Sequence, residues 1–415
     1  MKRYSILMLA GEASGDHHAA AMLKDLREYL PDVRVTGIGG DKLAAAGMDL
    51  LHHYSDVNTI GLSEGLGKAR NILNAYRTMK NELKSGRHDL FIPVDFPDVN
   101  LRLCRFAREA RVKVCYYISP QVWAWRKGRI RKIAARVDRM MTIFPFEAEM
   151  YRDEGIAADF VGHTMVRDIP PAFNKSDLRV GLGLDPGSHV IAVVPGSRPA
   201  EIRRILPLMC EAAKLYLVNH PDTKILLPLA GPHLSDLTED IIRAHGVSIT
   251  VHSVEAPTIM AASDCGLVTS GTATLQAALV GMPHAVVYKL DWFSWFIALR
   301  VLKPLVMDKD LHVAIANVLA ISSHKKGFGP LKGMLDAGVH IPCHECGRPL
   351  LVPELLQGHA TPQSLAYWLE RFQSDPALTT AMSSGFRQLR TMLDPPSDGS
   401  TPAGIVIKCL QADPG

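Results

Sequence analysis

The chain has 415 residues, of which 47% are hydrophobic and 21% are charged. This is the composition of a globular protein, and the length predicts two or three domains that each bury a core. A net charge of +4 is too small to indicate a nucleic-acid-binding protein. No apolar run reaches the roughly 18–20 residues of a transmembrane helix. Any membrane contact is therefore expected to be peripheral.

The seven cysteines are scattered along the chain and odd in number. This pattern is typical of a reducing compartment and not of a disulfide framework, so we expect a cytoplasmic protein. Cys343 and Cys346 make half of a zinc motif, but no second cysteine pair follows. We favour an insert with incidental His and Cys, and we expect no bound metal. The residues concerned are His340, Cys343, His344 and Cys346.

Strands and helices alternate through the N-terminal part of the chain. The apolar strand Tyr4–Ala10 enters a turn, Gly11–Asp16, which is followed by a helix, His17–Tyr29. Repetition of this pattern predicts a doubly wound α/β sheet. The turn lacks a complete G-x-G-x-x-G pattern, which disfavours a dinucleotide-dependent oxidoreductase. Further strands are predicted at Arg34–Gly37, Asp89–Val94, Val112–Ile118, Arg139–Ile143 and Phe160–Val161.

The composition changes at Pro170–Ser176, which is typical of an interdomain linker. Beyond it the α/β pattern returns. We predict two Rossmann-like domains, 1–170 and 177–375, with a ligand-binding cleft between them. For the remaining helix and tail, 376–415, we consider packing back on the N-terminal domain. Strands of the second domain are predicted at Val190–Val194, Lys224–Pro228, Ser248–Val251, Cys265–Thr269 and Ala285–Tyr288.

Two loops of the second domain predict a diphosphate site. Each separates an apolar strand from a helix and contains glycine and a hydroxyl residue, so backbone N–H groups can approach an anion. In the first loop, Arg198 adds a planar guanidinium suited to bidentate contact. An ordinary strand–turn–helix is the alternative for either loop alone. We predict one nucleoside diphosphate held by Gly196, Ser197, Arg198, Ser270, Gly271, Thr272 and Ala273.

The sequence Asp95-Phe96-Pro97-Asp98 ends a buried strand of the first domain. A carboxylate fixed and partly desolvated at a strand end can have a raised pKa and act as a general base. The alternative is an Asx turn that begins the next helix. We predict that Asp95 does chemistry and that Asp98 caps the helix Val99–Arg111.

Residues 101–139 contain twelve Lys and Arg against two acidic residues. A solvated helix face is one explanation, and attraction to an anionic membrane is the other. Within this segment Trp123, Trp125 and Arg126 form an aromatic and cationic loop, suited to the acceptor or the membrane side, or else to core packing. The apolar stretch Lys289–Met307 fits core or dimer packing first and an acyl-chain surface second.

These motifs, taken in order, resemble the lipid-A-disaccharide synthase family of inverting GT-B glycosyltransferases. The resemblance covers nearly the whole chain, and the combination is specific although each piece alone is common. The matching stretches are Ala10–Asp16, Asp95–Asp98, Ser119–Arg126, Phe144–Glu147, Gly162–Thr164, Pro195–Arg198, Ser270–Thr274 and Pro353–Gln357.

The resemblance implies a hexosyltransferase that joins UDP-2,3-diacylglucosamine to 2,3-diacylglucosamine 1-phosphate through a β-1,6 linkage and releases UDP. By position, Asp95 is the implied base and Arg198 a diphosphate ligand, while Glu12 and Asn317 are further polar groups of the active site. No cofactor is required on this interpretation. The acylated substrates imply peripheral attachment to the inner leaflet of the inner membrane, and a homodimer is left open.

Two departures from the family matter. Gln276 stands where the family usually has a glutamate that binds ribose hydroxyls. The glutamine side chain can still form hydrogen bonds, but it carries no charge. An insert of about 26 residues, 321–346, splits the family's Asn-x-Leu-Ala-Gly-Arg loop between Asn317–Ala320 and Gly347-Arg348. The departures leave open a UDP-N-acetylglucosamine transferase or epimerase of the same fold. They also leave open a catalytically degenerate relative that binds nucleotide or lipid.

Overall fold

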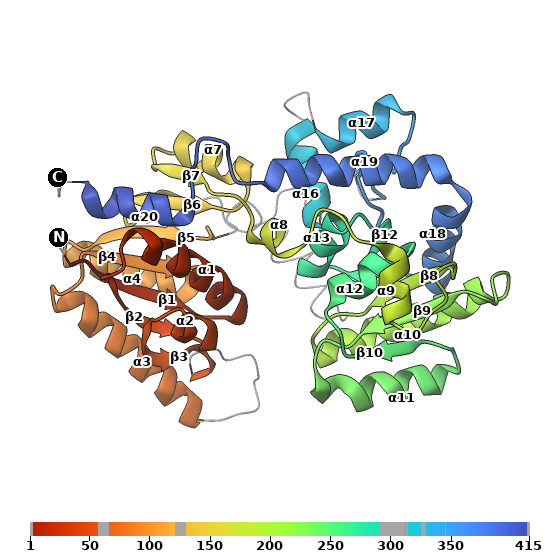
Figure 1. Ribbon diagram of the computed structural model, residues 1–415, viewed down its shortest axis with the longest axis horizontal. Coiled ribbons are helices and arrows are strands. Elements are labelled where there is room, and N and C mark those ends of the chain that lie inside the picture. Colours follow the sequence, from red (N-terminus) through yellow and green to blue (C-terminus); the bar gives the residue numbers. More distant parts are fainter. Residues whose placement is uncertain are drawn as a thin grey trace. The chain divides into compact units, whose positions relative to one another are not determined.

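A computed structural model of the protein describes residues 3–56, 66–120, 130–289, 312, 314–324, 329–344 and 346–412. The chain forms two compact units (Figure 1). The N-terminal unit combines Met1–Thr164 with Leu393–Gly415, and the C-terminal unit is Met165–Met392. Each unit has its own parallel sheet, so the predicted pair of doubly wound α/β domains is confirmed.

The sheet of the N-terminal unit has seven strands in the order β3-β2-β1-β4-β5-β6-β7, all parallel to their neighbours. The strand order reverses between β1 and β4, and such switch points bind ligands at the carboxyl ends of the strands. Its strands are β1 (Ser5–Ala10), β2 (Arg34–Gly39), β3 (Asp49–His53), β4 (Leu90–Val94), β5 (Lys113–Tyr117), β6 (Arg139–Thr142) and β7 (Ala158–Phe160). Its helices are α1 (Ala13–Tyr29), α2 (Asp41–Ala45), α3 (Leu66–Lys84), α4 (Pro97–Glu109), α6 (Ile130–Ala134), α7 (Pro145–Asp153) and α20 (Pro402–Gln411).

The sheet of the C-terminal unit has six parallel strands in the order β10-β9-β8-β11-β12-β13, with its switch point between β8 and β11. Its strands are β8 (Val190–Val194), β9 (Lys224–Pro228), β10 (Thr250–His252), β11 (Cys265–Thr269), β12 (His284–Tyr288) and β13 (Glu354–Leu356). Its helices are α9 (Lys175–Gly181), α10 (Pro199–Leu217), α11 (Ser235–His245), α12 (Ala256–Ala262), α13 (Thr272–Leu279), α16 (Ile315–His324), α17 (Pro330–Asp336), α18 (Pro362–Ser374) and α19 (Pro376–Leu393), and α8 (Thr164–Asp168) begins at the boundary.

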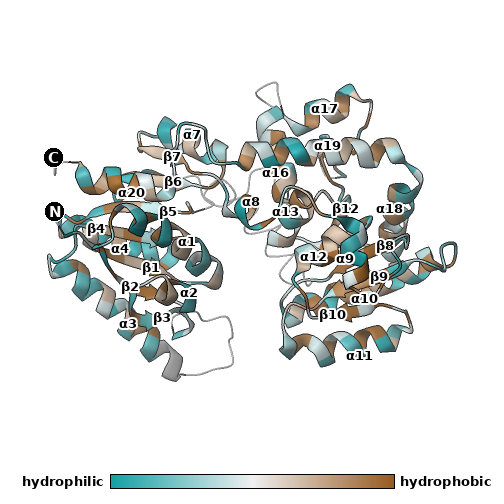
Figure 2. Ribbon diagram, viewed as in Figure 1, coloured by the Kyte–Doolittle hydropathy of each residue, from teal (hydrophilic) through white to brown (hydrophobic). Residues whose placement is uncertain are grey.

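In each unit the hydrophobic core forms where apolar strands are covered by helices on both faces of the sheet. Every residue of β4, β8 and β11 is buried, as expected for central strands of a parallel sheet. Hydropathy changes every few residues along α11 (Figure 2), and its buried residues, Thr238 and Ile242, lie four positions apart on one face of the helix. Within the described part of the chain, no helix has the length and apolarity that crossing a membrane requires.

Two edge strands were not predicted from the sequence. The strand β3 is half-exposed and contains two histidines, and β13 has only three residues. Neither has the long apolar run that marks a central strand. The last strand of the N-terminal unit, β7, begins at Ala158 and ends at Phe160, slightly before its predicted position.

The chain passes from one unit to the other twice, after Thr164 and after Met392. The segment Pro170–Ser176, expected as a linker, therefore belongs to the C-terminal unit. After the second passage, α20 packs on α1, β5 and β6 of the N-terminal unit (Figure 1). Lys113 at the start of β5 donates from Nζ to the carbonyl of Cys409 at 3.3 Å and to that of Ala412.

Candidate active site

Asp95 lies directly after β4, at the switch point of the N-terminal sheet. Its backbone N–H donates to the carbonyl of Tyr117 at 2.9 Å. Its own carbonyl accepts hydrogen bonds from Asn100 Nδ2 at 2.7 Å and from Tyr116 Oη at 2.6 Å. Three groups from α4 and β5 thus fix the backbone that carries the carboxylate.

The backbone at Asp95 and Phe96 is left-handed, with φ of 46° and 47°. Such a conformation costs about 1–2 kcal/mol for each residue other than glycine and is concentrated at functional sites. The Phe96 ring packs on Gly11, where an added β-carbon would lie 2.4 Å from ring atoms. Gly11 is therefore required, because it lets the loop after β1 meet the loop after β4.

Phe96, and not Asp98, precedes the first residue of the helix. The helix α4 begins at Pro97, which puts Asp98 in its first turn. The predicted capping role of Asp98 is wrong. Pro97 has the fixed φ that suits a first helical residue, so the helix begins at Pro97, earlier than predicted.

The carboxyl group of Asp95 has the electrostatics of a general base. Burial is the main cause that raises its pKa to about 6, and the negative charge of Glu12 raises it further, whereas a hydrogen bond from the Phe96 backbone opposes the rise. Glu12 immediately precedes α1 and makes no capping hydrogen bond with its side chain. A base with a pKa near 6 is ionised at neutral pH and still basic enough to take a proton.

A histidine pair lies elsewhere in the same unit. The Oγ1 of Thr164 hydrogen-bonds His18 Nδ1. The His18 and His163 rings meet edge-on, with centroids 6.3 Å apart. Burial, aided by His18, lowers the pKa of His163 to about 3, so this ring is neutral at physiological pH. His18 was not singled out from the sequence, because a single histidine on a helix does not indicate a site. Its partners, His163 and Thr164, follow β7 and are far from it in the sequence.

The C-terminal unit contains a pocket of about 920 Å³ at the carboxyl ends of β8, β9, β10 and β11. It brings together both predicted diphosphate loops. The predicted ligands that line it are Gly196, Ser197, Arg198, Ser270, Gly271, Thr272, Ala273 and Gln276.

Two helices begin at this pocket. Gly196 and Gly271 have φ of 109° and 141°, which turn each strand into the following helix. The residues before α10 and α13, Arg198 and Gly271, give their first turns no side-chain cap. Backbone N–H groups and the positive ends of two helix dipoles are therefore directed at one space. The side chain of Arg198 is 66% exposed and can turn toward an anion there.

Asn317, predicted as an active-site group, has a different task. Its side chain is completely buried. The Nδ2 group donates to the Val352 carbonyl at 2.9 Å and to Glu354 Oε1 at 2.8 Å. Its Oδ1 accepts from the backbone N–H groups of Leu351 and Val352 at 2.8 and 2.9 Å. All its hydrogen-bonding capacity is used within the protein, so Asn317 positions the segment before β13 and offers no atom to a ligand.

The insert 321–346 is partly described, and α17 lies within it. Near its end an antiparallel bridge joins Pro342 and Pro349, and the backbone of Gly347 donates to the Cys343 carbonyl at 2.9 Å. The His344 ring stacks on His359, and Cys346 Sγ lies 3.9 Å from His312 Nε2. Among the described residues, no three His, Cys, Asp or Glu side chains are arranged to hold a metal ion.

Several predicted features lie outside the described residues, namely Trp123, Trp125, Arg126 and the apolar stretch from 290 to 307. Part of the basic segment is described. Arg102, Lys132 and Arg136 line a pocket of about 210 Å³ between α4 and α6, together with Asp98. Cationic side chains therefore converge beside the first two turns of α4, the helix that follows Asp95.

Solved structures with the same architecture include nucleotide-sugar enzymes. A UDP-N-acetylglucosamine 2-epimerase from Neisseria meningitidis, bound to UDP-N-acetylglucosamine, matches with a TM-score of 0.57 and 10% identity over 99% of each chain. The calicheamicin glycosyltransferase CalG4 matches with a TM-score of 0.56 and 14% identity, also over 99% of each chain. At these identities the likeness establishes the fold, which is that of GT-B glycosyltransferases and related epimerases.

Sequence relatives are much closer. The profile of the lipid-A-disaccharide synthetase family matches residues 6–328. A lipid-A-disaccharide synthase of Anaeromyxobacter dehalogenans is 38% identical over 393 residues, which is 94% of both chains. One of Geobacter metallireducens is 34% identical over 409 residues, covering 98% of this chain and 97% of the relative. The chain therefore belongs to the lipid-A-disaccharide synthase family of glycosyltransferases.

Proposed function

We propose that the protein joins UDP-2,3-diacylglucosamine to 2,3-diacylglucosamine 1-phosphate, forming a β-1,6-linked disaccharide 1-phosphate and UDP. Family membership supports the reaction class. The observation that carries the proposal is the pocket at the β8 and β11 ends, where two helix N-termini and Arg198 converge as a diphosphate requires.

In the proposed reaction, Asp95 takes the proton of the acceptor 6-hydroxyl while the hydroxyl oxygen attacks the anomeric carbon of the donor. The new carbon–oxygen bond forms as the bond to the diphosphate breaks on the opposite face, which inverts the configuration. The electron pair leaves with UDP. The raised pKa of Asp95 matches this use as a base.

Arg198 and the N-termini of α10 and α13 would hold the negative charge that develops on departing UDP. Loss of one such donor costs about 3 kcal/mol in comparable oxyanion sites. With these groups supplying the positive charge, the proposed mechanism calls on no cofactor. Gln276 lines the same pocket and is half-buried, and we assign it to the ribose hydroxyls as an uncharged hydrogen-bonding group.

We further propose that the protein attaches peripherally to the inner leaflet of the inner membrane. The support is the basic segment 101–139, of which Arg102, Lys132 and Arg136 converge at one surface pocket. An acylated acceptor lies in such a membrane, so an enzyme that binds its anionic surface meets its substrate there. A homodimer remains a prediction.

The test is an assay of UDP release with both acylated substrates, comparing the wild type with Asp95→Asn. We expect turnover in the wild type and a loss of about 10²–10⁴-fold in the variant, as for removal of a general base. UDP-N-acetylglucosamine without the acylated acceptor should give no turnover. Conversion of that non-acylated sugar, or full activity of folded Asp95→Asn, would contradict the proposal.

A further inference from the structure

Glu201 lies in the first turn of α10 and folds back on the loop before it. Its Oε2 accepts a hydrogen bond from the backbone N–H of Ser197 at 3.2 Å. Its Oε1 accepts one from Arg198 Nη1 at 3.4 Å. The carboxylate lines the 920 Å³ pocket and its side chain is 31% exposed. The carboxylate of Glu201 thus accepts hydrogen bonds from the backbone N–H of Ser197 and from the guanidinium of Arg198 at the start of α10.

The fit of this carboxylate to the loop is close. At Gly196 an added β-carbon would lie 2.5 Å from Glu201 Oε2 and 3.0 Å from its Cβ. The carboxylate therefore occupies the space that a side chain at position 196 would take. Because glycine has no side chain, an anion can approach the backbone N–H groups of this loop. The Glu201 carboxylate makes such an approach in the structure, and a phosphate would need the same space.

We propose that Glu201 competes with the nucleotide diphosphate for the donors of the Pro195–Arg198 loop and is displaced when the nucleotide binds. This inference rests on the proposed function, because it takes the ligand to be a nucleoside diphosphate. A carboxylate and a phosphate cannot share these donors without repulsion. Glu201 consequently weakens UDP binding, and it ensures that only an anion with enough charge to displace it is held firmly.

Glutamine at position 201 separates this role from helix capping. Glu201→Gln keeps the length of the side chain and an oxygen that accepts from Ser197, but it removes the negative charge. The ion pair that it loses with Arg198 is exposed and contributes little. The repulsion that it removes acts only on a ligand with phosphate groups. A group that merely capped the helix would change the stability of α10 without distinguishing UDP from uridine.

The experiment measures the affinities of UDP, UMP and uridine by calorimetry for the wild type, Glu201→Gln and a control, Glu211→Gln. Glu211 is on the same helix, outside the pocket, and pairs with Lys214. In Glu201→Gln we expect UDP to bind about three- to tenfold more tightly. UMP should gain less and uridine nothing, and the control should match the wild type. The gain for UDP should shrink at high salt.

A second variant, Glu201→Ala, removes the charge without adding an amide and should tighten UDP binding in the same direction. Unchanged or weaker UDP binding in both folded variants would overturn the inference, and weaker binding would mean that Glu201 orients Arg198 toward the nucleotide. Failure of the wild type to bind UDP is a different result, since it would overturn the proposed function itself.

Discussion

Two features of Asp95 destabilise the folded protein, namely its left-handed backbone and its partly buried carboxylate. Hydrogen bonds from Asn100 and Tyr116 to its carbonyl hold the first in place. Burial and the charge of Glu12 raise the pKa of this carboxyl group from the ordinary value of 3.8 to about 6. A strained residue with a raised pKa, whose backbone is held in place by hydrogen bonds from two neighbouring elements, is typical of a functional position.

Asp95→Asn is expected to stabilise the protein while it lowers turnover by about 10²–10⁴-fold. The folded pKa lies above the unfolded one, so folding favours the protonated form and the charged form is penalised. This penalty is absent below about pH 4, grows between about pH 4 and 6, and is complete above. Denaturation at pH 8 should therefore show the variant more stable by about 2–3 kcal/mol, with no difference at pH 3.5. A less stable variant at pH 8 would contradict this account.

Glu12→Gln should shift the acid limb of the pH–rate profile to lower pH. Without the neighbouring negative charge, the pKa of Asp95 falls, but only part of the way because burial is the larger cause. The profile of kcat/KM reports this pKa in the free enzyme. Glu28→Gln, at the exposed far end of α1, is the control and should leave the limb unchanged. An unshifted limb in Glu12→Gln would mean that Glu12 does not act on Asp95.

At the scale of elements, the short edge strand β13 depends on one side chain. Asn317 on α16 makes four hydrogen bonds with Leu351, Val352 and Glu354. Glu354 in turn accepts from the backbone of Ala314 at 3.1 Å. A three-residue strand has little pairing of its own, so this network holds it against β12.

Asn317→Ala should lower the free energy of unfolding by about 2–4 kcal/mol, because it leaves buried backbone groups unpaired. Asn219→Ala, at an exposed site after α10, is the control and should change stability by less than about 0.5 kcal/mol. Chemical denaturation gives both values. If Asn317→Ala kept full stability and lost only activity, Asn317 would contact substrate after all.

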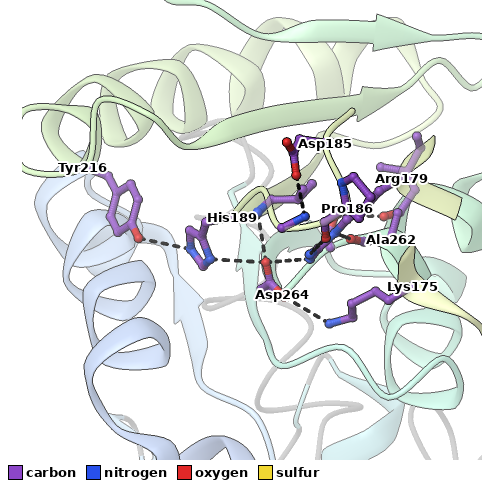
Figure 3. A network of polar contacts seen from close by, with 12 residues as sticks. Lys175, Arg179, Asp185, Pro186, His189, Tyr216, Ala262 and Asp264 are labelled. Atoms are coloured by element: carbon purple, nitrogen blue, oxygen red, sulfur yellow. Dashed lines mark hydrogen bonds and ion pairs between the residues drawn. The ribbon is translucent and has the colours of Figure 1, made fainter. Parts of the chain in front are cut away.

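A polar network joins α9 to the start of β8 through Asp264 (Figure 3). Asp264 Oδ2 accepts from Arg179 at 2.8 Å and from the Val190 backbone at 2.9 Å, and Oδ1 faces Lys175 at 3.2 Å. Burial alone would raise the pKa of Asp264. Hydrogen bonds from His189, Val190 and Arg179 and the charge of Lys175 outweigh it and hold the pKa well below its usual range.

Asp264→Asn should destabilise the C-terminal unit by about 2–3 kcal/mol at pH 7, since the buried Arg179 guanidinium loses its anion. Because the folded pKa is depressed, the advantage of the wild type is complete above the unfolded pKa near 4 and is lost as pH falls below it. Asp240→Asn removes an exposed ion pair on α11 and should cost less than about 0.5 kcal/mol. Urea denaturation at pH 7 and pH 3 tests both statements, and a difference independent of pH would refute them.

At the scale of the whole molecule, the last residues of the chain complete the first unit. The helix α20 is anchored to β5 by Lys113 and by apolar side chains that the fold covers completely. These buried residues are Ala403, Ile405 and Val406. The N-terminal unit is consequently not a continuous piece of chain, and its core includes residues nearly three hundred positions away.

Deletion of residues 394–415 should selectively loosen the N-terminal unit. The sides of β5 and β6 that α20 covers would become exposed, and hydrogen exchange of their amides should accelerate. Amides of β8 and β9 should keep their protection, because their sheet belongs to the other compact unit and has its own core. Deletion of 413–415 alone is the control. Equal protection of β5 and β6 in the full-length and shortened chains would contradict the prediction.

Local patterns predicted the features whose cause is local. Apolar runs marked the central strands because a parallel strand covered on both faces needs a continuous run. Glycine and hydroxyl residues between a strand and a helix marked the pocket loops, because close approach of a backbone to an anion depends on those few residues alone. Asp95 could also be predicted locally, because it is a carboxylate directly after a buried strand.

The sequence by itself therefore determined two doubly wound units, their central strands, the family and the loops that line the 920 Å³ pocket. Tertiary structure decided what depends on distant partners: the burial that makes Asn317 a positioning residue, the contact of Phe96 with Gly11, and the return of α20. These depend on packing between segments far apart in the chain, and no local pattern records such packing. The pKa of Asp95 lies between the two, since the residue is visible in the sequence but only the fold buries it beside Glu12.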